Sequence, residues 1–233
     1  MNRTFISILL TAILLSGLPA LCSAQETGRF PKGLMLNLDF GNVSNGLIPN
    51  RAFYPLYAPL GNLVTDNLLN EPMLLFTPDE GIDIPHSSLI QPDGSEWVVT
   101  VKIGAYPDGG TGMVMSQCND EVGYAIYLKD GAPRAVVRTG NCSMLLKEDA
   151  RTGITDCRNE LAIVELRIKS DMAWLTINRK RAAMVALDEP LSGDDMPIRL
   201  GNHARLPEIL KNIPGTDPVG FSGAIGTLKI WRQ

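Results

Sequence analysis

The sequence predicts an all-β protein, an antiparallel jelly-roll β-sandwich built from two packed sheets. Three observations lead to this prediction. Apolar and polar residues alternate along short segments, these segments recur roughly every ten residues, and clusters of Gly, Pro, Asn and Asp separate them. One segment, residues 206–211 (LPEILK), has a helical pattern, but it is long enough for only about two turns.

Each expected strand follows from alternation bounded by turn residues. In chain order, the strands are predicted at residues 34–40, 73–76, 97–103, 112–117, 124–128, 134–138, 161–169, 172–178, 182–187, 198–201 and 226–231. Residues 41–72 are rich in Asn, Pro and Gly, and they are expected to form one long loop. The sequence Lys-Asp-Gly-Ala at 129–132 is typical of a tight hairpin turn.

The segment 161–169 (LAIVELRIK) has the clearest pattern. Its predicted buried row is Ala162, Val164, Leu166 and Ile168, and its predicted solvent row is Glu165, Arg167 and Lys169. In the next strand the same alternation places Trp174 and Thr176 outward and Leu175 and Ile177 inward. Trp97 and Trp231 are both assigned to the core.

The first residues have the composition of an export signal. Arg3 precedes an apolar run, and small residues follow at 22–24, so residues 1–24 are predicted to be a signal peptide. Residues 25–33 then form a linker, and residues 34–233 form the sandwich domain. The expected location is secreted, periplasmic or at the cell surface. A lipid anchor on Cys22 is the less favoured alternative, because Leu21 stands directly before that cysteine.

Charge and hydropathy exclude two classes of partner. The chain has a formal net charge of −4 and no extended Lys/Arg-rich tract, so it lacks the basic surface that nucleic-acid binding needs. No apolar stretch after the signal approaches the roughly 20 residues of a membrane-spanning helix. We therefore expect no nucleic-acid partner and no transmembrane segment.

Cysteine usage is consistent with export through an oxidising compartment. Three cysteines remain after the signal, Cys118, Cys142 and Cys157, which allows three pairings with one thiol left over. The pairing Cys142–Cys157 is preferred because it closes a modest loop. A zinc site is disfavoured, since there is no Cys-x-x-Cys motif and the two histidines lie far apart in the sequence.

Several segments, taken together in order, resemble a known family. These are LNLDF (36–40), LLFTPDEGIDIPHSSLI (74–90), SEWVVTVKI (95–103), IRLGN (198–202) and FSGAIGTLKIW (221–231). Their order is similar to that of laminin G-like domains in the concanavalin A-like lectin/glucanase superfamily. The resemblance implies that the last strand lies beside the first, and it covers nearly all of residues 34–231. One departure is the sequence Asn-Arg-Lys at 178–180, where the family has an Asn-Gly turn.

The superfamily includes retaining glucanases, which use two carboxylates on one strand face about 5 Å apart. No Glu-x-Asp-x-x-Glu strand occurs here. Glu165 lies on a solvent row beside Arg167 and Lys169, which indicates a surface ion pair. Enzymatic activity is therefore uncertain and less favoured than binding.

The resemblance also suggests one cofactor. Lectin-like sandwiches often hold Ca²⁺ on loop carboxylates and carbonyl groups, which suits a hard cation. The candidate ligands are Asp39 and Asp79, with Asp66 and Asp195 as further carboxylates, although no spacing singles out one loop.

A sugar site needs an exposed aromatic face with polar groups nearby. Trp174 is the best candidate, beside Glu165 and Arg167, and Tyr127 is the second. The alternative is that the 41–72 segment covers either aromatic residue. The sequence thus predicts an exported, non-catalytic module that binds carbohydrate or an extracellular protein. The alternatives are a glycosidase or polysaccharide lyase of the same fold, and a structural surface protein without a small ligand.

Overall fold

The computed structural model describes residues 33–52, 56–119, 121–140, 142–147, 155–201 and 220–233. The expected signal peptide, nearly all of the linker and the expected helix at 206–211 lie outside these residues. The described chain belongs to one compact unit, and it contains no helix long and apolar enough to cross a membrane. Its elements in order are β1 (Leu34–Asp39), β2 (Leu47–Pro49), β3 (Tyr57–Pro59), β4 (Val64–Leu68), β5 (Glu71–Phe76), β6 (Gly81–Ile84), the 3₁₀ helix η1 (Ser88–Ile90), β7 (Trp97–Ala105), β8 (Gly112–Cys118), β9 (Gly123–Lys129), β10 (Ala132–Thr139), β11 (Cys142–Lys147), β12 (Ala162–Lys169), β13 (Met172–Ile177), β14 (Lys180–Ala186), β15 (Ile198–Gly201) and β16 (Gly223–Arg232).

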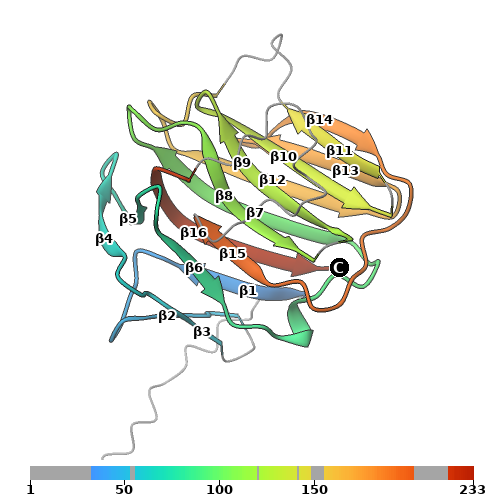
Figure 1. The fold of residues 1–233 in the computed structure, drawn as a ribbon, viewed down its shortest axis with the longest axis horizontal. Helices are drawn as coiled ribbons and strands as arrows, with labels where there is room; N and C mark the ends of the chain where they lie inside the picture. The colour runs from blue at the N-terminus through green and yellow to red at the C-terminus, as the bar shows by residue number, and fades with distance from the viewer. Residues whose placement is uncertain (1–32, 53–55, 120, 141, 148–154, 202–219) are drawn as a thin grey trace, which may run out of the picture. The chain divides into compact units, whose positions relative to one another are not determined.

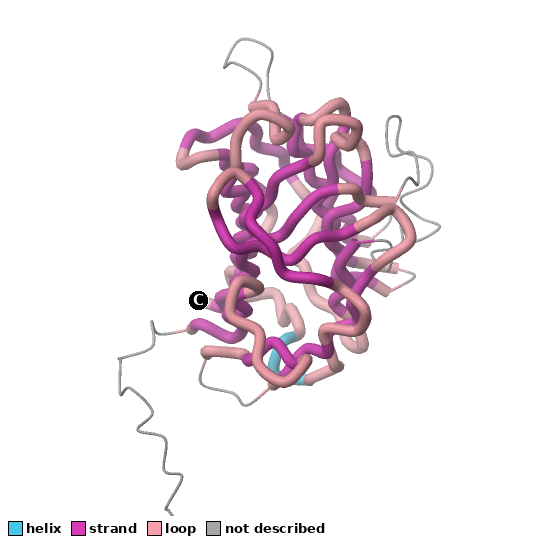
Figure 2. Tube along the Cα trace, turned by 90° about the vertical axis from the view of Figure 1, so that its left-hand side faces the viewer, coloured by secondary structure: helices cyan, strands magenta, loops and turns pink. Residues whose placement is uncertain are grey.

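Two antiparallel sheets make up the sandwich, as the sequence predicts (Figure 1; Figure 2 gives the side view). The larger sheet has eight strands in the order β14-β13-β12-β7-β16-β5-β4, with β1 also paired to β16. The smaller sheet has six strands in the order β11-β10-β9-β8-β15-β6. A short hairpin, β2-β3, forms a separate two-stranded sheet, and its Ile48 and Ala58 pack into the same core.

The first and last strands lie side by side, which confirms that prediction. Leu38 in β1 is directly opposite Leu228 in β16, in antiparallel register. One edge of β16 pairs with β7 along nearly its whole length, while the other edge pairs first with β5 and then with β1. The last strand is therefore an interior strand of the larger sheet, and its backbone groups are bonded on both sides.

The core lies between the two sheets and consists of the inward rows of most strands. In β12 the predicted buried residues Ala162, Val164, Leu166 and Ile168 are all at most 1% exposed. Trp97 is fully buried, as predicted. The core assignment of Trp231 is wrong. This residue is half-buried, and it lies opposite Val98 on the outer face of the larger sheet, whereas its neighbour Ile230 points inward.

A chain of hydrogen bonds crosses the core. Trp97 Nε1 donates to the Tyr124 hydroxyl at 3.3 Å, and that hydroxyl donates to Gln117 Oε1 at 2.7 Å. Gln117 Nε2 in turn donates to the carbonyl of Ile90 at 2.6 Å. Burial raises the pKa of the Tyr124 hydroxyl well above its usual range, so this group keeps its proton. The network thus satisfies three buried side chains and ties η1 to both sheets.

The turns confirm one prediction and correct another. Asp130 and Gly131, with φ of 55° and 84°, form the expected tight hairpin between β9 and β10. Residues 41–72, however, are not a single loop, because they contain β2, β3 and β4. These strands have only three to five residues each, and they lie in a separate hairpin or at the sheet edge, so their alternation is too brief to stand out in the sequence.

The turn between β13 and β14 leads to a stability prediction. Asn178 and Arg179 both have positive φ, 49° and 67°, which is the conformation of a two-residue hairpin turn. A left-handed backbone conformation costs a residue with a side chain roughly 1–2 kcal/mol, and glycine avoids this cost. Glycine loses more conformational entropy on folding, however, which offsets part of the stabilisation. We expect Arg179→Gly to raise the free energy of unfolding by about 0.5–1 kcal/mol in urea titration. An unchanged or lower stability would contradict the strain in this turn.

Candidate functional site

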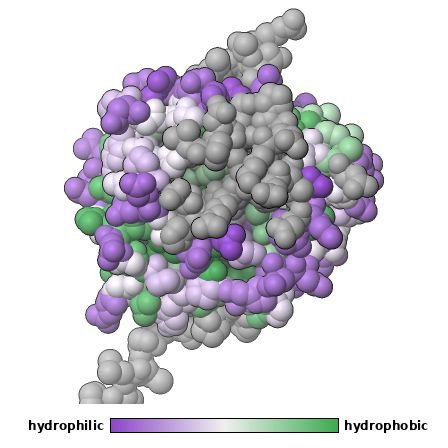
Figure 3. Space-filling model, viewed as in Figure 1, coloured by the Kyte–Doolittle hydropathy of each residue, from purple (hydrophilic) through white to green (hydrophobic). Residues whose placement is uncertain are grey.

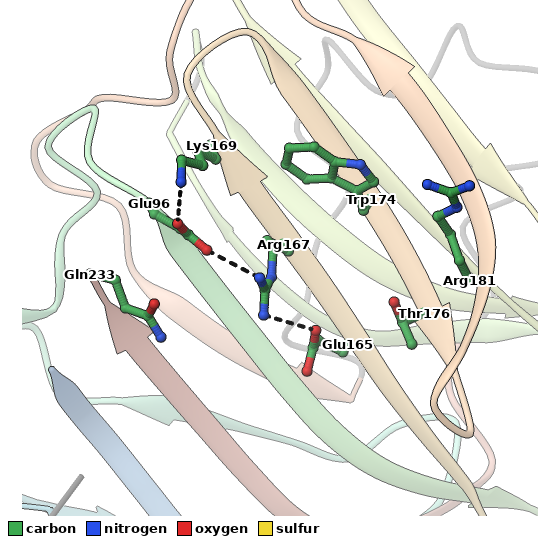
Figure 4. Close-up of a pocket in the computed structure, with 8 residues that line it drawn as sticks. All are labelled: Glu96, Glu165, Arg167, Lys169, Trp174, Thr176, Arg181 and Gln233. Atoms are coloured by element: carbon green, nitrogen blue, oxygen red, sulfur yellow. Dashed lines mark ion pairs between the residues drawn. The ribbon is translucent and has the colours of Figure 1, made fainter. Parts of the chain in front are cut away.

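The outer face of the larger sheet carries a pocket of about 540 Å³, within the usual range for small-ligand sites. Seven of its eight lining residues are charged or polar, and the eighth is a tryptophan. The lining residues are Glu96, Glu165, Arg167, Lys169, Trp174, Thr176, Arg181 and Gln233 (Figure 4).

Strand alternation explains why these side chains share one face. In β12 the inward residues alternate with Glu165, Arg167 and Lys169, which therefore point outward. Antiparallel register then sets Trp174 directly opposite Arg167, and Thr176 directly opposite Glu165. Residues directly opposite each other lie on the same side of a sheet, so Trp174 stands among the charged groups of β12.

Glu96 organises the charges at one end of the pocket. Its Oε1 lies 3.3 Å from Arg167 Nη1, and its Oε2 lies 3.0 Å from Lys169 Nζ. The other guanidinium nitrogen of Arg167, Nη2, lies 3.6 Å from Glu165 Oε1. The side chain of Glu96 is only 11% exposed, so these pairs are partly shielded from water and hold Arg167 in one orientation.

Gln233, which directly follows β16, completes this side of the pocket. The Glu96 amide donates to the carbonyl of Gln233 at 3.2 Å, and the Gln233 amide donates to the carbonyl of Glu96 at 2.9 Å. This reciprocal pair fixes the backbone of Gln233, and its side-chain amide joins the lining (Figure 4). An amide both donates and accepts hydrogen bonds, which suits recognition of hydroxyl groups.

The pocket therefore combines an aromatic side chain with oriented polar groups. Trp174 is half-buried and leaves part of its indole open, while carboxylate, guanidinium, hydroxyl and amide groups surround it. Such a set can stack on an apolar ring face and hydrogen-bond the polar substituents around that ring.

Three of the four predicted ligand residues come together here. Trp174, Glu165 and Arg167 all line the pocket. Tyr127 does not, because it belongs to β9 in the smaller sheet and is 2% exposed. It packs in a second apolar cluster with Met113, Ala125 and Val136, and burial raises the pKa of its hydroxyl.

Sequence reasoning missed five lining residues as ligand candidates. Lys169 and Thr176 lie on the outward rows of β12 and β13, so alternation alone could have included them. Arg181 follows the turn after β13, and its alignment with Thr176 depends on a register shift in β13 and β14. Glu96 and Gln233 are brought together only by long-range pairing, which has no local sequence signal.

The predicted calcium ligands lie in different settings. Asp39 ends β1, where its carboxylate pairs with Arg51 at 3.5 Å and accepts a hydrogen bond from the Gly41 amide at 3.2 Å. Asp79 is exposed in the turn between β5 and β6. Within the described ranges, no three His, Cys, Asp or Glu side chains gather closely enough to hold a metal ion.

The predicted Cys142–Cys157 disulfide is not formed in this structure. Cys157 is fully buried and packs within the core between the sheets. Cys142 starts β11 and is half-buried, and a hydrogen bond with Asp188 raises the pKa of its thiol. The two side chains thus belong to different environments, although their sequence spacing would allow a loop.

Comparison with known proteins identifies the fold. No protein-family model matches the sequence, and neither does any curated protein. Among solved structures, the binding domain of Paraclostridial Mosquitocidal Protein 1 is similar, with a TM-score of 0.64, 12% identity, and coverage of 86% of this chain and 49% of that one. The botulinum neurotoxin serotype G binding domain is similar with a TM-score of 0.60, 14% identity, and coverage of 86% and 48%.

A third structure, the binding domain of botulinum neurotoxin DC in complex with SialylT, has a TM-score of 0.58, 10% identity, and coverage of 86% and 48%. The chain thus spans about half the length of the structures it matches. At these identities the likeness establishes the fold alone: a β-sandwich shared with part of these toxin binding domains. The laminin G-like assignment has no match of its own.

Proposed function

We propose that this chain is a non-catalytic binding module and that it holds carbohydrate in the pocket around Trp174. The observation that carries the proposal is the composition of the lining, one half-buried tryptophan among seven charged or polar side chains. Sugar rings present apolar CH faces that stack on an indole and hydroxyl groups that need paired donors and acceptors. Glu165 can accept such hydrogen bonds, Arg167 can donate them, and Gln233 can do both.

The fold supports the same function. The structural neighbours are described as binding domains, and one of them was solved in complex with SialylT. We extend to this chain only the expectation that such a sandwich binds rather than transforms its ligand. We also propose that the protein is exported, from the signal-like residues 1–24, and that it is a distant laminin G-like member of the concanavalin A-like superfamily, from its ordered motifs and the pairing of β1 with β16.

A protein partner is less well supported than a glycan. The large apolar side chains with the greatest exposure are scattered over many elements, at Leu47, Tyr57, Val64, Leu69, Leu89, Ile163 and Met184. Where described residues are visible in Figure 3, hydrophobic areas are small and separated by hydrophilic residues. Stable protein interfaces usually bury one continuous patch with an apolar centre, which these residues do not provide.

A glycan array probed with the purified protein tests the proposal. We expect reproducible binding to a subset of glycans, and we expect the set to stay the same after chelation, because no described carboxylate cluster would hold calcium at the pocket. Binding to no glycan on an array that contains neutral, carboxylated and sulfated sugars would refute the proposed function. Binding that disappears with chelator would place the sugar at a metal-dependent site instead.

One observation favours a second candidate, a glycosidase or polysaccharide lyase. Glu96 and Glu165 line the same pocket and contact the same guanidinium, that of Arg167. Paired carboxylates are the usual acid and nucleophile of glycoside hydrolysis. However, both Glu96 oxygens are occupied by cations, which leaves neither directed at a ligand. Release of new reducing or unsaturated ends from a bound glycan, lost in Glu165→Gln, would establish the enzyme.

A further inference from the structure

Among the described residues, two of the three cationic side chains that line the pocket form ion pairs, and the third does not. Arg167 and Lys169 are both engaged by carboxylates, those of Glu96 and Glu165. Arg181, the third cation of the lining, makes no ion pair with any residue that the structure describes. The lining therefore has three cations against two carboxylates, although the chain as a whole has a net charge of −4.

Arg181 is placed to meet a ligand that stacks on Trp174. It lies in β14 directly opposite Thr176, and its side chain is exposed. Figure 4 shows its guanidinium on the far side of Trp174 from the group formed by Glu96, Arg167 and Lys169. A planar guanidinium binds carboxylate and sulfate groups through two parallel hydrogen bonds, and it stays charged at any working pH.

The same face extends beyond the pocket along the register of the sheet. Trp174 and Arg167 are aligned with Val98 in β7 and then with Trp231 in β16. The two tryptophans are thus three strands apart, which is about 14 Å at the usual strand spacing. The half-buried Trp231 gives this row a second aromatic side chain, far enough away to contact another sugar of the same chain.

A parallel row carries charge at both ends. Arg181, Thr176 and Glu165 are aligned with Thr100 and then with Lys229. Lys229 also makes no ion pair within the described part of the chain. Four strand spacings separate Arg181 from Lys229, about 19 Å. The row that contains Trp174 and Trp231 and the row that contains Arg181 and Lys229 therefore run side by side across β13, β12, β7 and β16.

We infer that the ligand is an anionic oligosaccharide, one that carries carboxylate or sulfate groups and lies across these strands. Arg181 receives an acidic group near the sugar stacked on Trp174, and Lys229 receives another near the sugar at Trp231. The inference rests on the proposed function and adds the chemical class of the sugar. It explains why an acidic protein keeps an excess of cations in the lining of this pocket.

Titration calorimetry with matched probes tests the inference. The probes are an oligogalacturonate against its methyl ester, for carboxylate, and a dextran sulfate oligomer against dextran, for sulfate. We expect at least one charged probe to bind more tightly than its neutral counterpart, and added salt to weaken that binding. Arg181→Gln should lower the affinity for the charged probe by about tenfold or more, since hydrogen bonds to charged groups are stronger than neutral ones. Lys147→Gln makes the same change of charge on the exposed end of β11 in the other sheet, and it should have no effect.

The outcomes separate this inference from the proposed function. If neutral probes bind as tightly as charged ones and Arg181→Gln changes nothing, the inference is wrong while the sugar site stands. If the charged probe binds equally well to Trp174→Ala, the face is a general cationic surface, and both proposals are wrong. Loss of tight binding in both Arg181→Gln and Trp174→Ala, with Lys147→Gln unchanged, supports both.

Discussion

Replacing Trp174 by Ala is expected to lower glycan affinity by about 30-fold or more, equivalent to at least about 2 kcal/mol. The indole is the one aromatic side chain in the pocket, so its removal takes away the stacking surface. The remaining lining groups are polar, and they hydrogen-bond to water in the free protein almost as well as to a sugar. Because the side chain is half-buried on the outer face, its loss should leave the core between the sheets intact. Titration calorimetry against the tightest array glycan measures the change.

A matched control is available on the same face. Ile163 is 41% exposed on the outward row of β12, but it is outside the pocket lining. Ile163→Ala also removes an apolar side chain from this sheet, and it should leave glycan affinity unchanged. Equal affinities for wild type and Trp174→Ala, or equal losses in the two variants, would show that the sugar binds elsewhere.

Replacing Gln117 by Leu is expected to lower the free energy of unfolding by about 3 kcal/mol. The leucine fills a similar volume, but the Tyr124 hydroxyl then loses its acceptor and the Ile90 carbonyl loses its donor. Both groups are in the dry interior, where an unpaired polar atom costs about 1–3 kcal/mol. Urea titration followed by tryptophan fluorescence gives the value.

The double variant Gln117→Leu/Tyr124→Phe distinguishes this cause from simple misfit. Tyr124→Phe alone leaves Trp97 Nε1 without its acceptor and Gln117 Oε1 without its donor, whereas the double variant has neither the Tyr124 hydroxyl nor the Gln117 amide left to strand. The double variant should therefore lose less stability than the sum of the two single losses. A double variant that loses stability by the sum of the two single losses would mean that packing, and not unpaired polar groups, sets the effect.

Local alternation was enough to predict most of the sandwich and the centre of the site. The strand at 161–169 has one apolar row and one charged row, and the structure buries the first and exposes the second. The outward position of Trp174 follows from the same rule in the next strand, because a short turn leaves little freedom of register. Those two strands supply five of the eight lining residues.

The positions of Trp231, Tyr127 and Glu96 depend on strand register and long-range contacts, which cannot be predicted from alternation along one strand. A register shift between Ile225 and Thr227 reverses which residues of β16 face inward, and Trp231 therefore lies on the outer face instead of in the core. Tyr127 does point away from the main core, as its position in the strand indicates, but its face is covered and the side chain is buried. Glu96 is held at the pocket by backbone hydrogen bonds with Gln233, a residue that is far away in the sequence.

The interior position of β16 has a consequence for how the protein acquires its structure. A ribosome makes β16 after β1, β5 and β7, yet these three strands can join into one sheet only through it. Contacts between Leu38 and Leu228 span nearly the whole polypeptide, and topologies dominated by such distant pairings fold slowly. The newly made chain should therefore remain loosely organised until β16 has been made, and the pocket around Trp174 should appear in the same cooperative step as the larger sheet.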